Sequence, residues 1–250
     1  MSPRRSFDDA LAAIDGVAGW LSAGQARQLY DAAAAVRPGG QIVEIGSFRG
    51  RSTVVIASAI ADDVALIAID PHAGNDRGPQ EIAGYESVAA TDHEVFLANL
   101  DHAGVASRVR HVRAFSDAAH PQVVGSLAML YVDGAHRYAP ARADIRDWGS
   151  RVDVDGTLLI HDSFSSIGVT LAIVRELVFG KRWRYVGRSR SLAVYHCDLA
   201  QSPSARLANA TRQLAQMPWF VRNLLVKVAL TLRLGSLLSA VRGRSVDWPY

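Results

Sequence analysis

The chain has 250 residues, of which 49% are hydrophobic and 20% are charged, and its formal net charge is +3 at pH 7. This composition supports a full hydrophobic core and excludes general disorder, and the length fits one large domain or one domain with an appendage. The single cysteine, Cys197, excludes an intrachain disulfide and a cysteine-rich zinc cluster and suits a reducing cytoplasm.

The positive charge is concentrated at the C-terminal end of the chain. From residue 203 onward seven Arg or Lys and one Asp give +6, so the rest of the chain carries −3. The body therefore lacks the basic face typical of nucleic-acid-binding proteins, and we expect no nucleic-acid partner. No N-terminal pattern resembles a signal peptide, and no run of ~18 apolar residues predicts a spanning helix. We expect a cytoplasmic protein.

The N-terminal segment, residues 1–36, is predicted to form one or two helices. Apolar residues recur at three-to-four spacing in DDALAAIDGVAGWL and SAGQARQLYDAAAAV, and Ser22 is the expected N-cap of the second helix. RPGG then ends the helical pattern. We assign residues 1–36 to N-terminal helices, 37–200 to the main domain and 201–250 to a basic, apolar helical tail.

Strand and helix patterns alternate through the main domain. QIVEI, VALIAID, RVRHV, LAMLYVD and GTLLIHD are predicted strands, separated by helical stretches such as RSTVVIASAIA and DHEVFLANLDHAG. RWRYVG and SLAVYH, joined by RSRS, predict a terminal antiparallel hairpin. Apolar strands that alternate with helices are typical of a parallel sheet covered on both faces. The predicted fold is α/β: a doubly wound, Rossmann-like, mostly parallel sheet of seven strands.

Acidic residues or histidine stand at the ends of four predicted strands. They are Glu44, Asp70, Asp133 and the pair His161–Asp162. In open α/β sheets, ligands bind outside the carboxyl ends of the strands. A single acid at a strand end is a common turn residue, but four such ends predict a functional site.

The stretch VEIGSFRGRST predicts a ligand-binding turn between a strand and a helix. Gly46 stands in the turn and Gly50 near the helix start, and Asp70 ends the next strand, where an acid can accept hydrogen bonds from ribose hydroxyls. A dinucleotide-binding turn reads G-x-G-x-x-G, and Phe48 replaces its second glycine. This disfavours NAD and favours S-adenosylmethionine, which has no phosphate. The alternative is a helix-starting glycine pair without a ligand.

Four motifs together resemble a class I S-adenosylmethionine-dependent methyltransferase: VEIGSFRGRST, IAIDPH, MLYVDGAHRYAPARADIRDW and DGTLLIHDSF. The resemblance covers about residues 37–196, and the nearest subgroup has a DGxHxY strand end and a later HD pair. It implies a seven-stranded sheet with a reversed C-terminal hairpin. It also implies cofactor contacts from Glu44, Gly46, Ser52 and Asp70, and an adenine pocket around Phe115, Ser116 and Asp117.

The stretch YVDGAHRY places a carboxylate, Asp133, and an imidazole, His136, three residues apart at a strand exit. Methylation of a hydroxyl requires removal of its proton, and His136 suits a general base. A divalent cation can also lower the pKa of the hydroxyl, and Asp133 and Asp162 suit Mg²⁺ as oxygen ligands. Each residue also has a purely structural interpretation. Asp133 and Gly134 could form an ordinary turn, His136 could be a solvated surface residue, and His161 could be a histidine of the core.

The sequence is also similar to metal-dependent sugar O-methyltransferases of macrolide and polysaccharide biosynthesis. This similarity implies that Asp133 is a metal ligand and that His136 is the base; Asp133 also counts among the expected cofactor contacts. Those enzymes often have two adjacent acids at the second strand end, where this chain has His161 and Asp162. The candidate metal set is therefore Asp133, His161 and Asp162, with Mg²⁺ or another divalent cation. A metal-free mechanism that uses His136 stays open.

Two further segments are candidates for contacts with an acceptor, another subunit or a membrane. The polar loop at residues 72–90 suits a hydroxyl-rich acceptor, or it is a mobile surface loop. Residues 218–244 are dense in apolar side chains and basic. They are predicted to pack on their own domain, to contact another subunit of a homo-oligomer, or to lie on an anionic membrane surface.

These patterns predict an S-adenosylmethionine-dependent O-methyltransferase that acts on a sugar or polyol hydroxyl of a small-molecule or glycan acceptor. One alternative is a metal-independent methyltransferase for a small molecule or lipid. Another is a non-catalytic cofactor-binding subunit tethered by its tail. Hydride transfer is disfavoured by Phe48 in the glycine turn.

Overall fold

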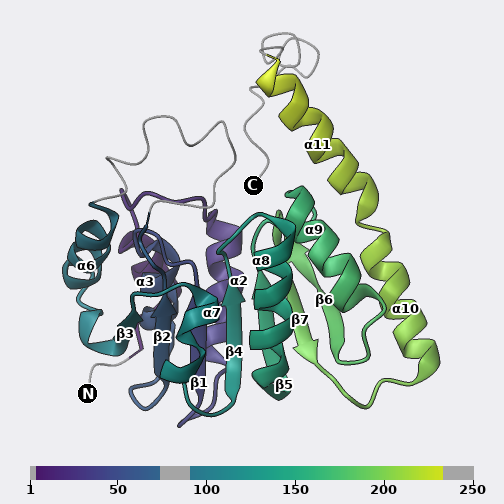
Figure 1. Ribbon diagram of the computed structural model, residues 1–250. Coiled ribbons are helices and arrows are strands. Elements are labelled where there is room, and N and C mark those ends of the chain that lie inside the picture. The colour runs from purple at the N-terminus through teal and green to yellow at the C-terminus, as the bar shows by residue number, and fades with distance from the viewer. Residues whose placement is uncertain (1–3, 74–90, 233–250) are drawn as a thin grey trace.

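The computed structural model describes residues 4–73 and 91–232. Its centre is a seven-stranded sheet in the order β3-β2-β1-β4-β5-β7-β6 (Figure 1). Strands β1 to β5 pair in parallel, and β7 runs antiparallel to both β5 and β6. The predicted fold and the terminal hairpin are therefore confirmed. The strands are β1 (Gln41–Ile45), β2 (Ala65–Ile69), β3 (Val109–Val112), β4 (Leu127–Val132), β5 (Val152–Ile160), β6 (Trp183–Ser189) and β7 (Leu192–Cys197).

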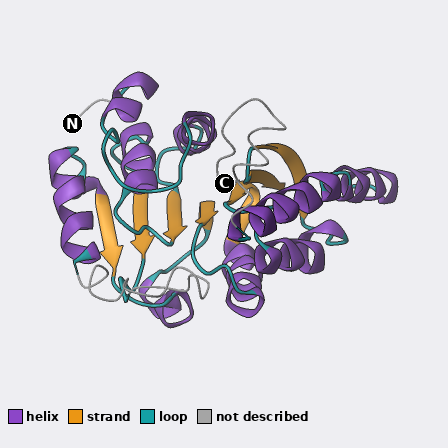
Figure 2. Cartoon of the chain, turned by 90° about the horizontal axis from the view of Figure 1, so that it is seen from above, coloured by secondary structure: helices purple, strands orange, loops and turns teal. Residues whose placement is uncertain are grey.

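Helices cover both faces of this sheet (Figure 2). They are α1 (Phe7–Ala12), α2 (Ala23–Ala34), α3 (Arg51–Ala59), α6 (Asp92–His102), α7 (Ser116–Ala119), α8 (Tyr138–Ala143), α9 (Ile167–Ile173), α10 (Pro203–Leu214) and α11 (Met217–Thr231). Successive strand residues point to opposite faces: in β4, Tyr131 packs with α2 and α3, whereas Leu130 packs with α8 and α9. The sheet is thus buried from both sides, as its continuous apolar strands predict.

The N-terminal helices are shorter than their apolar pattern predicts. Ser22 caps α2 as expected, and the Gln25 side chain accepts a hydrogen bond from the Ser22 N–H, which completes a capping box. The first helix ends at Ala12, because Gly16 and Gly19 adopt positive φ values of 73° and 148°. The following residues are held by the Arg51 guanidinium, which donates hydrogen bonds to the carbonyls of Ile14, Val17 and Leu21.

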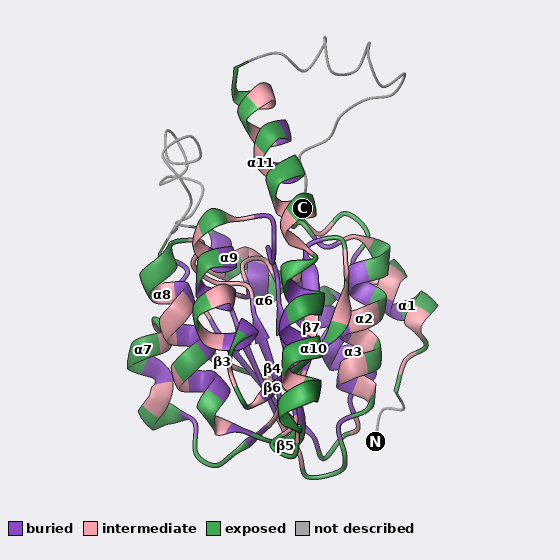
Figure 3. Ribbon diagram, turned by 90° about the vertical axis from the view of Figure 1, so that its right-hand side faces the viewer, coloured by how far each residue is buried: buried purple, intermediate pink, exposed green. Residues whose placement is uncertain are grey.

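The C-terminal helices lie at the β6 edge of the sheet. Asn209 joins α10 to β6 by accepting from the Tyr185 N–H and donating to the Trp183 carbonyl. The next helix, α11, extends away from the body (Figure 3). Among the described residues, no helix has both the length and the hydropathy needed to cross a membrane. Most of the predicted acceptor loop, and the tail beyond residue 232, lie outside the described residues.

Candidate active site

A cavity of about 430 Å³ opens at the carboxyl ends of the parallel strands, where ligands bind in open α/β sheets. All but one of the residues predicted for the site line this cavity. They are Gly46, Ser52, Asp70, Phe115, Ser116, Asp117, Asp133, His136, His161 and Asp162. The exception is Glu44. The strand ends therefore bring together residues that are up to 116 positions apart in the sequence.

Gly46 lies where the ends of β1 and β4 approach each other most closely. Its φ is +86°, and a Cβ at this position would lie 2.3 Å from the Asp133 carbonyl oxygen. Any other residue would push the Asp133 backbone away. The glycine turn therefore fixes the position of Asp133 as well as the shape of the floor of the cavity.

Glu44 lies inside β1 and is fully buried beneath the cavity. Burial raises the pKa of its carboxyl group to about 8, although hydrogen bonds from Ser52 and Thr53 oppose the increase. Its two oxygens are thus taken up by the first turn of α3. In this arrangement Glu44 supports the wall that contains Ser52, and it has no cavity-facing surface of its own.

Asp70 follows β2, and its carboxylate organises the glycine turn. Oδ2 accepts hydrogen bonds from the N–H groups of Ser47 at 2.9 Å and Phe48 at 2.8 Å, and Oδ1 accepts from His72 N–H at 2.7 Å. Phe48 has a φ of +47°, which is uncommon for a residue with a side chain. Asp70 therefore lines the cavity and also holds this turn in its unusual conformation.

The predicted adenine pocket lies at the start of α7. Phe115 has an exposed fraction of 62%, and Ser116 donates a hydrogen bond to Asp144. Burial raises the pKa of Asp144 to about 6, with the neighbouring Asp117 adding to the increase. These four residues line one end of the cavity.

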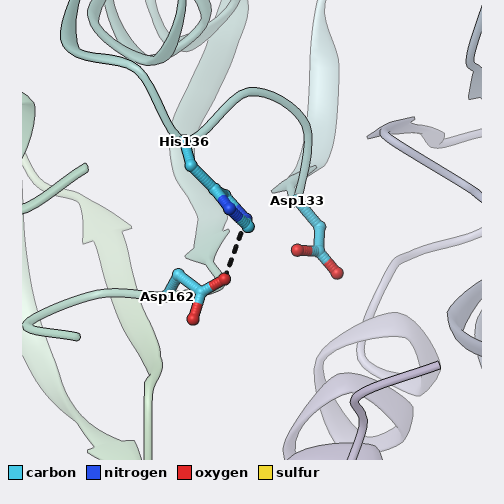
Figure 4. Close-up of side chains that lie close together, drawn as sticks. All are labelled: Asp133, His136 and Asp162. Atoms are coloured by element: carbon cyan, nitrogen blue, oxygen red, sulfur yellow. Dashed lines mark ion pairs between the residues drawn. The ribbon is translucent and has the colours of Figure 1, made fainter. Parts of the chain in front are cut away.

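In the same cavity, His136 faces Asp162 and lies close to Asp133 (Figure 4). His136 Nε2 is 2.9 Å from Asp162 Oδ2, and the Tyr131 hydroxyl donates a 2.8 Å hydrogen bond to Asp133 Oδ2. One ligand atom from each of Asp133, His136 and Asp162 lies within 4.8 Å of the others. The ends of β4 and β5 therefore assemble two carboxylates and one imidazole, a donor set that could hold a divalent cation.

His161 lies behind these carboxylates. Its Nδ1 is 3.2 Å from Asp133 Oδ1 and 3.5 Å from Asp162 Oδ2, while its Nε2 is 3.3 Å from Gln25 Nε2. The Gln25 amide oxygen accepts from Ser22, so its NH₂ group faces the imidazole. In the neutral form of the ring, Nε2 is then the acceptor, and Nδ1 carries the proton toward the carboxylates. His161 thus orients the two acids rather than offering a free nitrogen.

The electrostatics of this group follow from its close pairing. Burial alone would lower the pKa of His136 and of His161, but the carboxylates of Asp162 and Asp133 outweigh it at both histidines and raise both pKa values. Burial would raise the pKa of Asp162, yet the two histidines hold it well below its usual range. At His161 the Gln25 NH₂ group acts against the charged form.

Helix α9 fixes the backbone of His136. The Ser166 hydroxyl lies 3.3 Å from the His136 carbonyl oxygen, to which it donates a hydrogen bond. A Cβ on Gly168 would lie 2.2 Å from the same oxygen. Only glycine lets the helix start approach this closely, so α9 and the strand exit of β4 are in direct contact next to the imidazole.

Sequence reasoning missed four residues that shape the site. Gln25 appears in the sequence only as a helix-capping residue, Tyr131 as an apolar strand residue, and Asp144 and Arg51 as helix residues. The S-x-x-Q capping box could have indicated that the Gln25 oxygen was already used. Arg51 and Asp144 had no detectable signal, because their contacts join elements that are far apart in sequence. Tyr131 contacts Asp133 only two positions on, but an apolar strand pattern does not show where its hydroxyl points.

Comparisons with known proteins agree with this geometry. Residues 43–163 match a family model described as a methyltransferase domain. The O-methyltransferase NovP is 18% identical, with a TM-score of 0.59 over 70% of this chain and 78% of that chain. A Corynebacterium glutamicum protein is 16% identical, with a TM-score of 0.58 over 78% and 91%. The O-methyltransferase TomG from Streptomyces achromogenes, solved with S-adenosylmethionine, is 16% identical, with a TM-score of 0.50 over 79% and 91%.

The matched domain contains every predicted site residue, from Glu44 to Asp162. At these low identities the structural matches establish a shared fold. The domain match shows that residues 43–163 are similar to methyltransferases, and the structural matches show the fold that this chain shares with them.

Proposed function

We propose that the chain transfers the methyl group of S-adenosylmethionine to a hydroxyl oxygen of an acceptor that contains a sugar or another polyol. The observation that carries this proposal is the pairing of His136 with Asp162, beside Asp133, at the edge of the cavity. The resemblance of the motif to sugar O-methyltransferases supports the acceptor class.

The pair suits proton removal from a hydroxyl. A neutral hydroxyl attacks a sulfonium methyl group poorly, so its proton must leave as the new O–C bond forms and the S–C bond breaks. His136 Nε2 donates to the Asp162 carboxylate at 2.9 Å, so Nδ1 would take this proton, and Asp162 would stabilise the resulting imidazolium. S-adenosylhomocysteine is then the leaving group. A neutral amine acceptor would not need such a base before attack, which favours oxygen as the methylated atom.

The two carboxylates also suit a divalent cation. Asp133 and Asp162 offer the oxygen ligands that Mg²⁺ prefers, and one ligand atom from each of them and from His136 lies within 4.8 Å of the others. A cation held there would lower the pKa of the acceptor hydroxyl. His161 fits this set less well, because its Nε2 faces the Gln25 NH₂ group. We therefore place Asp133 and Asp162 as ligands and His161 as the residue that orients them.

The alternative within catalysis is a metal-independent methyltransferase for a small molecule or lipid, in which the His136–Asp162 pair alone removes the proton. The direct 2.9 Å contact of the pair favours this reading, since a cation would compete with His136 for Asp162. A non-catalytic cofactor-binding subunit would have no use for the pair.

The first test is calorimetric titration of S-adenosylhomocysteine into the full chain, with Mg²⁺ and separately with EDTA. Binding in both conditions is expected, because the residues around the glycine turn contact neither carboxylate of the proposed cation site. Absence of binding in both would contradict the assignment of the cofactor. Methyl transfer to a panel of sugar and polyol acceptors, again with and without EDTA, then separates the two enzyme readings. Binding without any transfer would favour the non-catalytic subunit.

A further inference from the structure

The chain that follows β5 forms a tight turn at residues 162–166, and this turn contains one member of the His136–Asp162 pair. The Asp162 carbonyl accepts hydrogen bonds from the N–H groups of Ser165 at 3.1 Å and Ser166 at 3.0 Å. Asp162 and Phe164 have positive φ values of 54° and 55°. Residues with side chains keep this conformation only where surrounding contacts hold it. The position of the Asp162 side chain therefore depends on what holds the 162–166 turn.

Both members of the pair are attached to this turn. Asp162 Oδ2 lies 2.9 Å from His136 Nε2 (Figure 4). At the end of the turn, the Ser166 hydroxyl donates a hydrogen bond to the His136 carbonyl. A movement of the 162–166 turn would therefore displace the carboxylate and also release the backbone that carries the imidazole.

Helix α11 contacts the 162–166 turn through two hydrogen bonds. Asn223 Nδ2 donates to the Phe164 carbonyl at 3.1 Å, and Lys227 Nζ donates to the Ser165 carbonyl at 3.0 Å. Asn223 has an exposed fraction of 0%, and burial of an amide is unfavourable unless its hydrogen bonds are made. Residues four positions apart share one face of a helix. One face of α11 thus binds two successive carbonyl groups of the turn.

Apolar packing seats the same face of α11. Phe220, three residues before Asn223, packs against the core cluster that contains Phe164. Val226 is 5% exposed, whereas Leu225 is 64% exposed. The face of α11 that contacts the turn is therefore its buried face, and the position of the helix is set by the core that surrounds the turn.

We propose that α11 is a positioning element of the active site, in which Asn223 holds the 162–166 turn so that Asp162 faces His136. The proposal rests on the proposed function, which gives the pair its part in proton transfer. An apolar residue at position 223 would also bury surface, but only a donor fixes the direction of the Phe164 carbonyl. The matched family model ends at residue 163, and α11 begins at residue 217. A helix outside the matched domain thus takes part in arranging the reacting groups.

The test is a magnetic resonance spectrum of the histidine rings in the full chain, labelled with ¹⁵N-histidine, because ring nitrogen shifts report hydrogen bonding and tautomer. Asn223→Leu removes the donor and keeps a side chain of similar size. We expect the ring signals of His136 and His161 to shift in this variant, while those of His72 keep their wild-type positions. Leu225→Ala, on the exposed face of the same helix, is the matched control and should leave every histidine signal unchanged.

Turnover gives a second readout. A displacement of ~1 Å at a reacting group can cost about 10²-fold in rate. In Asn223→Leu, kcat for an acceptor from the sugar and polyol panel should fall roughly tenfold or more, whereas affinity for S-adenosylhomocysteine should stay within about twofold. A helix with a structural role alone would lower thermal stability without this split. Lys227→Met should lower kcat by a smaller factor, and Lys227→Arg, which keeps a donor, should restore it.

Two outcomes would overturn the proposal. Wild-type ring signals of His136 and His161 in a folded Asn223→Leu variant would show that the turn keeps its position without this contact. Equal losses of kcat and of cofactor affinity would show a general loss of structure. If circular dichroism shows that Asn223→Leu is unfolded, Lys227→Met takes its place in both measurements. Failure of the wild type to bind S-adenosylhomocysteine would contradict the proposed function, and the histidine spectra would still test α11, because they need neither cofactor nor acceptor.

Discussion

Two groups of histidines at the strand ends lie in opposite electrostatic settings. At the ends of β4 and β5, burial would lower the pKa of His136 and His161, but nearby carboxylates outweigh it and raise both. At the ends of β2 and β3, burial lowers the pKa of His72, and it lowers that of His111 to about 4. The difference lies in the partners. His72, His111 and His93 lie with ring centroids 5.0 to 5.3 Å apart, so the neighbouring histidines disfavour a charge on His72 and on His111.

The difference suits the carboxylate-paired histidines to proton transfer and the three-histidine cluster to packing. A histidine paired with a carboxylate can gain a proton during a reaction without leaving an isolated buried charge. The three-histidine cluster has Asp70, Asp92 and Arg113 as charged neighbours, yet two ring nitrogens of His72 and one of His111 are buried without a hydrogen-bond partner. We infer that His72 and His111 pack as neutral rings, and that proton transfer belongs to the β4–β5 side.

The largest expected effect comes from breaking the carboxylate-paired side. His136→Gln should lower turnover by roughly 10²-fold or more, the usual size of a general-base contribution. Affinity for S-adenosylhomocysteine should stay within a factor of about two, because His136 is paired with Asp162 and does not hold the glycine turn. Initial rates and calorimetry measure the two quantities. His102→Gln, an exposed histidine at the end of α6, is the control. Equal turnover in the two variants would remove His136 from the mechanism.

A smaller effect is expected from the three-histidine cluster, and it appears in stability. The folded protein holds the pKa of His111 at about 4, below the ordinary 6.5. The unfolded chain therefore binds a proton below pH 6.5 that the folded chain excludes, and stability falls as the pH decreases from 6.5 toward 4. Between pH 7.5 and 5 this amounts to about 2 kcal/mol.

His111→Gln should remove that part of the pH dependence. Urea unfolding of the wild type and the variant at pH 7.5 and 5.0 gives the two differences to compare. His102→Gln should follow the wild type. If the His111 variant loses as much stability as the wild type on acidification, the cluster is not held neutral by the fold.

The sheet, and the gathering of its strand-end residues around one cavity, were predictable from sequence for a local reason. Strand ends show as apolar runs that stop at Asp70, Asp133 or His161, and parallel strands place such ends at one edge. The roles of individual residues within the site were harder to predict from the sequence. His161 was predicted to be a metal ligand because it stands beside Asp162. The orientation of its ring depends on Gln25 of α2, which lies 136 positions earlier in the sequence. The placement of Glu44 beneath the cavity depends likewise on side-chain direction within β1.

The smallest of the three effects concerns the glycine turn on the cofactor side. Asp70 accepts hydrogen bonds from the N–H groups of Ser47, Phe48 and His72. Asp70→Asn keeps the shape of the side chain but replaces one acceptor oxygen with a donor NH₂ group, which faces at least one of these N–H groups. An unmade buried hydrogen bond costs about 1–3 kcal/mol, so affinity for S-adenosylhomocysteine should fall by roughly tenfold. Asp101→Asn on the exposed side of α6 is the control for loss of charge. Unchanged affinity in Asp70→Asn would show that the turn keeps its conformation without this carboxylate. The cofactor side of the cavity would then depend on Gly46 and the strand ends alone.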